Sequence, residues 1–246
     1  MPADAPTILA TSGGYFAGGR IRRTFAPLVT AAIELSGVSS RAPRITHLGT
    51  AMGDQRHLNA ELTEAADVAG FDLTHLNLYP MPSVDDMEGL LMASDVVWVN
   101  GGSVANLLAV WRVHGLDSIF ERVWRSGVVL AGVSAGSICW HMGGTTDSFR
   151  PELDPVTNGL GLLPYANGVH YDNEERRRPL VHELVANGTL PDTYCTDDGV
   201  GLVYRDTQLV EAITEIRGKG AYLVTRDGDR AIEERIDPRV LPGARG

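Results

Sequence analysis

The sequence is poor in cysteine and lacks long apolar runs. Its two cysteines, Cys139 and Cys195, are too few for a disulfide framework or a cysteine zinc site. We therefore expect both thiols to serve as small buried apolar groups. No apolar run approaches the length that spans a bilayer, and the first residues, MPADAP, lack the basic and apolar regions of a signal peptide. We expect a cytoplasmic protein with no membrane partner.

Basic stretches and metal-binding motifs are also lacking. The net charge is −10, and no basic run is interleaved with aromatics, which argues against a nucleic-acid partner. No H-E-x-x-H or comparable spacing indicates a metal. Residues 12–19 are rich in glycine but lack both the G-x-G-x-x-G spacing and the lysine of a P-loop, so we expect no nucleotide cofactor and interpret them as a plain flexible loop.

Short apolar segments alternate with helical patterns along the chain. Strands are predicted at residues 7–11, 44–50, 71–79, 96–99 and 128–133, and helices at 25–35, 54–68, 104–113 and 116–125. This alternation predicts an α/β fold with a mainly parallel sheet covered by helices on both sides. No linker interrupts it, so we expect one domain over residues 1–246 with its core at 7–225. Residues 208–214 and 220–225 resemble a terminal hairpin, and residues 241–246 a disordered tail.

Residues 128–140, VVLAGVSAGSICW, join an apolar segment to a serine flanked by glycines. Gly132 and Gly136 stand two positions before and after Ser134, where a sharp strand-to-helix turn needs residues without side chains. We interpret Ser134 as a nucleophile on such an elbow, followed by a helix over residues 135–141. The alternative is that Ser134 only caps this helix. Cys139 lies inside the helix rather than at the turn, which argues against a nucleophilic thiol.

A second glycine-rich turn, Asn100-Gly101-Gly102, follows the preceding strand. Ligands bind at the carboxyl ends of the strands in such sheets, so this turn and Ser134 are expected at one edge. Acyl transfer needs hydrogen-bond donors for the developing oxyanion, and we assign the backbone N–H groups of Gly102 and Ala135 to this role. The alternative is that the glycines only make a tight turn.

A serine nucleophile needs a base, and His170 has the most suitable position. It ends an extended segment, residues 163–170, that leads into a polar stretch. The other histidines fall within predicted strands or helices: His47, His57, His75, His114, His141 and His182.

Four acids could orient the histidine, namely Asp147, Asp172, Asp197 and Asp198. Asp172 is too close to His170 in the chain and is expected to cap the next helix. Asp197-Asp198-Gly199 precedes a predicted strand and could turn a carboxylate inward, although Asp-Asp-Gly is also an ordinary surface turn. The order serine, histidine, acid differs from that of α/β-hydrolases and indicates another scaffold.

Taken together, these motifs resemble the peptidase E family, the aspartyl dipeptidases, whose relatives include the cyanophycinases. The resemblance covers residues 7–225 and implies a three-layer α/β/α sandwich similar to class I glutamine amidotransferases, with serine in place of cysteine. It implies that Ser134 is the nucleophile, His170 the base, and the residue before Gly199, here Asp198, the acid. The family has glutamate there, one methylene longer, so Asp197 or Asp147 remains an alternative. The family's Gly-Gly-Gly-Asn-Thr is loosened here to residues 100–104, NGGSV, which bears on substrate preference.

The implied activity is that of a serine exopeptidase acting on a small peptide partner, such as a dipeptide with N-terminal Asp, through an acyl-enzyme and without metal or cofactor. Aspartyl specificity would need a cation, for which Arg150 and Arg176-Arg177-Arg178 are candidates. Two other functions stay open: a cyanophycinase-like hydrolase, and a catalytically silent binding or amidotransferase-like domain. The sequence also leaves the oligomeric state open, with a homo-oligomer as one alternative.

Overall fold

The larger of two main sheets has eight strands in the computed structural model, which describes residues 3–246. Its strand order is β16-β13-β12-β1-β7-β6-β4-β5. The strands are β1 (Thr7–Thr11), β4 (Arg44–Leu48), β5 (Asp72–His75), β6 (Val96–Val99), β7 (Val129–Val133), β12 (Val200–Arg205), β13 (Gln208–Ile216) and β16 (Arg239–Arg245). The adjacent strands β1, β7, β6, β4 and β5 pair in parallel, while β12 is antiparallel to both its neighbours. The prediction of an α/β fold with a mainly parallel central sheet is confirmed.

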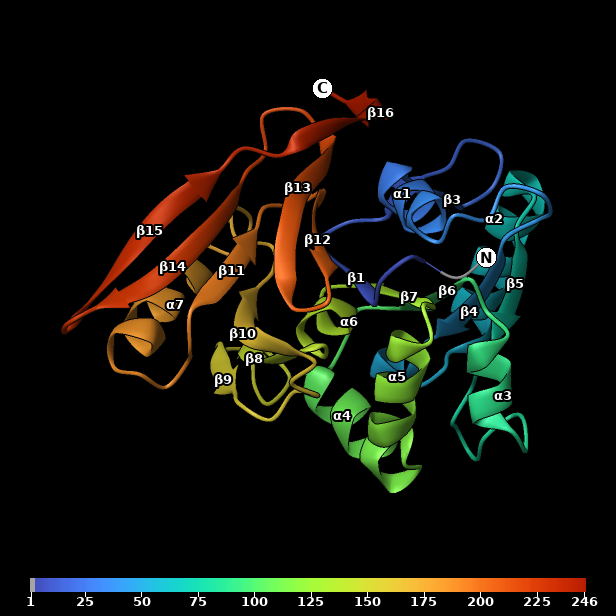
Figure 1. Ribbon diagram of the computed structural model, residues 1–246, viewed down its shortest axis with the longest axis horizontal. Helices are drawn as coiled ribbons and strands as arrows, with labels where there is room; N and C mark the ends of the chain where they lie inside the picture. Colours follow the sequence, from blue (N-terminus) through green and yellow to red (C-terminus); the bar gives the residue numbers. More distant parts are fainter. Residues whose placement is uncertain (1–2) are drawn as a thin grey trace.

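Helices cover both faces of this sheet (Figure 1). On one side lie α1 (Pro27–Leu35) and α2 (Arg56–Ala69), and on the other α3 (Met87–Met92), α4 (Val104–Val113) and α5 (Leu116–Arg125). Neighbouring strand residues alternate between the two resulting cores, so that Val97 packs toward α4 and α5 and Trp98 toward α1. Among the described residues, no helix has the length and apolar character to cross a membrane.

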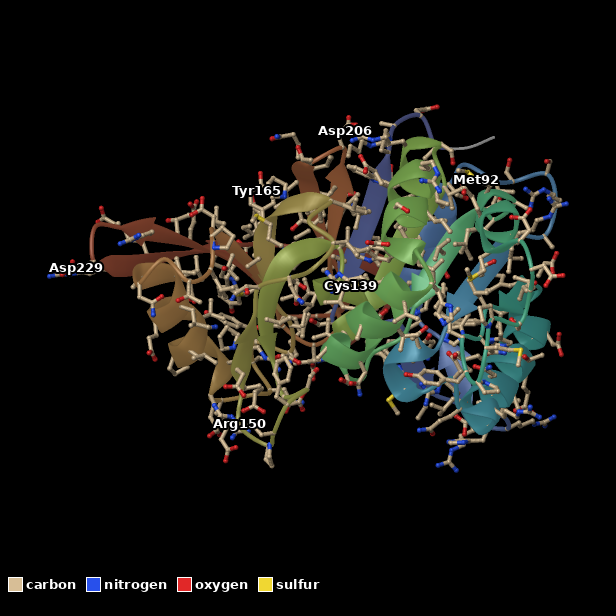
Figure 2. The ribbon with its side chains drawn as sticks, turned by 90° about the horizontal axis from the view of Figure 1, so that it is seen from below. Met92, Cys139, Arg150, Tyr165, Asp206 and Asp229 are labelled. Carbon is tan, nitrogen blue, oxygen red and sulfur yellow. The ribbon has the colours of Figure 1, made fainter. Side chains whose placement is uncertain are left out.

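A second, six-stranded sheet lies beside the first and was not predicted. It contains β8 (His141–Thr146), β9 (Asp154–Val156), β10 (Leu163–Gly168), β11 (Thr193–Thr196), β14 (Ala221–Asp227) and β15 (Arg230–Ile236). Helix α7 (Arg177–Ala186) packs on β14 and β15, and the short α6 (Ala135–Ile138) joins the two sheets. Figure 2 shows Cys139, just after α6, in the middle of the molecule and Asp229 at the far tip of the β14–β15 hairpin.

Several sequence-based boundaries were wrong. The helix after Ser134 ends at Ile138, and His141 begins a strand instead of ending a helix. Strands β13 and β14 do not form a hairpin with each other, because they belong to different sheets. The expected tail is largely β16, which pairs in parallel with β13. The glycine-rich loop leads into a small hairpin of β2 (Tyr15–Ala17) and β3 (Arg23–Phe25).

Candidate active site

Ser134 occupies a sharp turn between β7 and α6. Its backbone has φ 58° and ψ −113°, a conformation that costs a residue with a side chain on the order of 1–3 kcal/mol. The flanking glycines are required by close backbone packing: a Cβ on Gly132 would lie 2.4 Å from the carbonyl oxygen of Gly136. A Cβ on Gly136 would lie 2.1 Å from the carbonyl oxygen of Val99. This is a tightly packed strand-to-helix turn, and it leaves Ser134 partly exposed.

The end of β1 holds three distant segments together. The Ser134 N–H donates to the carbonyl oxygen of Thr11 at 3.0 Å. The next residue, Ser12, accepts the His170 N–H at Oγ (3.0 Å) and the Gly199 N–H at its carbonyl oxygen (2.9 Å). Two consecutive residues at one strand end therefore bind all three segments: Thr11 binds residue 134, and Ser12 binds residues 170 and 199.

His170 and Asp198 are in direct contact. His170 Nδ1 lies 2.5 Å from Asp198 Oδ1, and about a third of each side chain is exposed. His170 has a left-handed backbone with φ 51°, which turns the chain sharply after Val169. An imidazole that donates from Nδ1 to a carboxylate presents Nε2 as an acceptor, the tautomer that a general base requires.

Asp172, paired with Lys219, holds the backbone of Asp198. The Asp198 N–H donates to Asp172 Oδ1 at 2.9 Å, and Asp172 also forms an ion pair with Lys219. Burial alone would raise the pKa of Asp172, but Lys219 and the Asp198 N–H outweigh it, so the pKa is lowered. Asp172 is thus a charged acceptor for the backbone of Asp198. The sequence-based prediction that it caps the next helix was wrong.

The other two candidate acids lie elsewhere. Asp197 is 4% exposed and accepts the Gly220 N–H at 2.8 Å through Oδ2, so its carboxylate serves the start of β14. Burial raises the pKa of Asp197 despite this hydrogen bond. Asp147 is exposed on the loop after β8 and acts electrostatically on Arg176 and Arg177. Of the four acids, Asp198 is the one in contact with the His170 ring.

The turn after β6 borders Ser134. A Cβ on Gly101 would lie 3.0 Å from the Cβ and 3.6 Å from the Oγ of Ser134. Gly102 has φ 132° and is exposed, and a Cβ there would lie 2.4 Å from the carbonyl oxygen of Ala51. Within residues 3–246, neither the Gly102 N–H nor the Ala135 N–H has a protein acceptor. Two free donors therefore lie on the segments that meet at Ser134.

The arginines suggested for substrate binding are all engaged. Arg150 pairs with Asp154, Arg176 with Glu174, and Arg178 with Glu233. Arg177 is 6% exposed and donates to the carbonyl oxygen of Thr145. Figure 2 shows Arg150 on an outer loop. None of the four is a free cation in this structure.

Cysteine and metal chemistry receive no support from the geometry. Both thiols are fully buried, and burial raises the pKa of Cys139 well above its ordinary value. Residues 3–246 contain no group of three His, Cys, Asp or Glu side chains placed to hold a metal ion. A cleft of about 400 Å³ beside α1 and β13 contains none of the predicted site residues.

Comparison with known proteins identifies the family. The model of peptidase family S51 matches residues 8–212. The chain belongs to peptidase family S51. This S51 member is 39% identical over 182 residues to the uncharacterized peptidase YgaJ of Bacillus subtilis (strain 168), a match that covers 74% of this chain and 78% of the relative.

Solved structures agree on the fold of this S51 chain. A peptidase from an acI-B1 Actinobacterium superposes with a TM-score of 0.67 at 16% identity over 95% of both chains. A protein from Listeria monocytogenes EGD-e assigned to peptidase E superposes with a TM-score of 0.60 at 17% identity, over 83% of this chain and 96% of that one. The resemblance to peptidase E drawn from the motifs is confirmed.

Sequence reasoning missed three residues that build the site of this S51 chain: Ser12, Lys219 and Glu215. Glu215 is 1% exposed and accepts the N–H groups of Gly14 (2.8 Å) and Leu28 (2.9 Å), which holds the loop after Ser12 in place. The loop is therefore tied down and not a plain flexible one. The signal available in the sequence was the position of Ser12 at the carboxyl end of a buried strand.

Proposed function

We propose that the protein is a serine exopeptidase that hydrolyses short peptides through Ser134, His170 and Asp198. Membership of family S51 supports peptide hydrolysis. The observation that carries the assignment of residues is the end of β1, where Thr11 and Ser12 hydrogen-bond to Ser134, His170 and Gly199. Three sequence segments with the chemistry of a nucleophile, a base and an acid share one anchor.

In the proposed first step, His170 Nε2 removes the proton of Ser134 Oγ as that oxygen attacks the scissile carbonyl. The Asp198 carboxylate holds the Nδ1–H tautomer and stabilises the imidazolium that forms. The N–H groups of Gly102 and Ala135 receive the oxyanion. His170 then gives its proton to the leaving amine, and the C–N bond breaks to leave an acyl-enzyme on Ser134.

In the second step, a water gives its proton to His170 and attacks the acyl carbon. Collapse of the second tetrahedral intermediate returns the proton to Ser134 Oγ and releases the acid. The strained backbone of Ser134 keeps its side chain at the sharp turn between β7 and α6. The one-methylene shortening from glutamate to aspartate is accommodated by direct contact between Asp198 and His170.

The engaged arginines bear on specificity. Arg150, Arg176, Arg177 and Arg178 each have an acid or a carbonyl partner, so an acidic first residue would have to compete for them. We propose that the enzyme accepts short peptides with a neutral first residue. A panel of dipeptides with Asp, Ala, Leu or Lys in the first position tests this directly.

The decisive experiment combines labelling with hydrolysis. A fluorophosphonate probe is expected to label the wild-type protein and not Ser134→Ala, and dipeptide hydrolysis is expected to fall to background in the same variant. Ser137→Ala is the matched control, because Ser137 lies three residues away and its Oγ donates to Asn167. A folded wild-type protein that neither labels nor hydrolyses any peptide in the panel would favour a silent binding domain.

A further inference from the structure

A line of polar side chains runs beneath α2 toward the turn that borders Ser134. Tyr15 donates to Asn100 Oδ1 at 2.6 Å, and Asn100 directly precedes Gly101. His47 Nδ1 lies 2.9 Å from His75 Nδ1, and His75 Nε2 lies 2.9 Å from Thr63 Oγ1. These side chains come from five different elements or loops and are not used in the proposed mechanism.

The hydrogen positions in this line follow from one fixed donor. Thr63 Oγ1 donates to the carbonyl oxygen of Asn59 at 3.0 Å, as expected for a threonine inside a helix. It must then accept from His75 Nε2, which leaves His75 Nδ1 as an acceptor. His47 therefore donates from Nδ1, and its Nε2 carries a lone pair. Each step has one solution when both rings are neutral.

His47 is held neutral by its surroundings. It is 1% exposed, and burial, followed by the nearby His75, lowers its pKa to about 3. His47 pairs with Trp98 across β4 and β6, and Tyr15 contacts both Trp98 and Asn100, so Asn100 lies on the face of the sheet that carries His47. His47 Nε2 has no hydrogen-bond partner among the described residues. A buried acceptor without a donor is destabilising, so a nearby donor is expected to use it.

Asn100 has the donor that His47 lacks. Its Oδ1 accepts from Tyr15, its backbone N–H is bound to the carbonyl oxygen of Leu48 at 3.0 Å, and its NH2 group has no hydrogen-bond partner among the described residues. Tyr15 in turn lies edge-on to Trp98, with ring centroids 6.1 Å apart. Rotation of the Asn100 amide is thus restrained by Tyr15.

We infer that His47 is a positioning residue: its Nε2 accepts from the Asn100 amide and so fixes the turn that carries the Gly102 N–H. This inference rests on the proposed function, since a fixed Gly102 N–H matters only when an oxyanion forms at Ser134. The effect is on the barrier and not on ground-state binding, because the oxyanion exists only during the reaction.

A matched pair of variants tests which ring nitrogen matters. In His47→Gln the side-chain amide reaches the place of Nε2 and can offer its oxygen to Asn100, while the contact with His75 is lost. In His47→Asn the amide lies near the place of Nδ1, so the contact with His75 is kept and Asn100 loses its acceptor. Both variants replace a neutral ring by a neutral amide in the same buried position.

The expected result is a split between the two variants in kcat. Loss of a whole oxyanion donor lowers kcat by about 10²–10³. In His47→Asn the Gly102 N–H is loosened and not lost, so we expect kcat to fall about tenfold and KM to change less than about twofold. His47→Gln is expected to stay within about threefold of wild type. If His47→Asn does not fold, Tyr15→Phe tests the same restraint from its other side, and we expect kcat to fall severalfold at unchanged KM.

Two outcomes would overturn the inference. Equal losses in His47→Asn and His47→Gln, or a fall in thermal stability that accounts for the lost activity, would show that His47 acts only through packing. A wild-type protein without Ser134-dependent turnover would refute the proposed function and this inference together. Ser134-dependent turnover that is indifferent to both His47 variants would refute the inference alone.

Discussion

The buried His141 predicts a specific loss of stability in acid. Its side chain is fully buried between the sheets, Nδ1 donates to the carbonyl oxygen of Ser137 at 2.9 Å, and Nε2 lies 3.5 Å from the Tyr204 hydroxyl. Burial is the main cause that lowers its pKa from 6.5 to about 4. The folded protein therefore keeps this ring neutral over a range in which the unfolded chain is protonated.

The sign of the effect follows from the two pKa values. Above pH 6.5 both states are neutral and the contribution of His141 is fully present. As the pH falls from there toward about 4, the unfolded chain binds more protons than the folded one and stability is lost. Between about pH 7 and about pH 5 this linkage amounts to about 2 kcal/mol for the single group.

The variant His141→Asn isolates that contribution. Asparagine keeps a donor near the carbonyl oxygen of Ser137 but does not titrate, so its packing cost is the same at every pH. Urea unfolding of both proteins at pH 7 and pH 5 gives the stability gap between them. We expect the gap to shrink by about 2 kcal/mol at pH 5, while buried carboxyls such as Glu215 affect both proteins alike. A gap that stays constant within about 0.5 kcal/mol would refute the buried neutral ring.

Three further variants probe the site. Asp198→Asn is expected to lower kcat by about 10²–10⁴, because an amide at this position can donate to Nδ1 and favours the wrong tautomer of His170. The control Asp197→Asn should leave kcat unchanged. A larger loss in Asp197→Asn than in Asp198→Asn would indicate that Asp197 is the acid. Ser12→Ala removes the acceptor of the His170 N–H, and we expect kcat to fall about tenfold. Circular dichroism should show that the variant is folded. Full activity would show that β1 does not position His170. Gly101→Ala places a methyl group 3.0 Å from Ser134 Cβ, so Ser134 has to shift and fluorophosphonate labelling is expected to slow in a folded protein. Labelling at the wild-type rate would contradict the geometry of the turn.

The parts of the fold that could be predicted are those encoded by neighbouring residues. Helices α4 and α5 begin and end where the periodicity places them, because their apolar stripes and flanking residues are local features. The sharp turn at Ser134 could be predicted in the same way, since the two glycines around Ser134 are needed for contacts that one short segment makes with its neighbours.

What could not be predicted depends on distant pairing. Apart from the β14–β15 hairpin, the second sheet and β16 consist of segments that find partners far along the chain, and short strands of this kind carry little local signal. The same holds for Ser12 and Lys219, whose importance comes from contacts with residues 170 and 172. His170 and Asp198 were suggested by position and by family resemblance, and the structure places them in contact.

The anchoring role of β1 has a consequence for biosynthesis. Thr11 and Ser12 are synthesised well before their third partner, Gly199, which follows Ser12 by 187 residues. Until that segment emerges, the nascent polypeptide can form the sharp turn at Ser134 but lacks the contact between His170 and Asp198. The proposed catalytic group could therefore be completed only after residue 199 has been made.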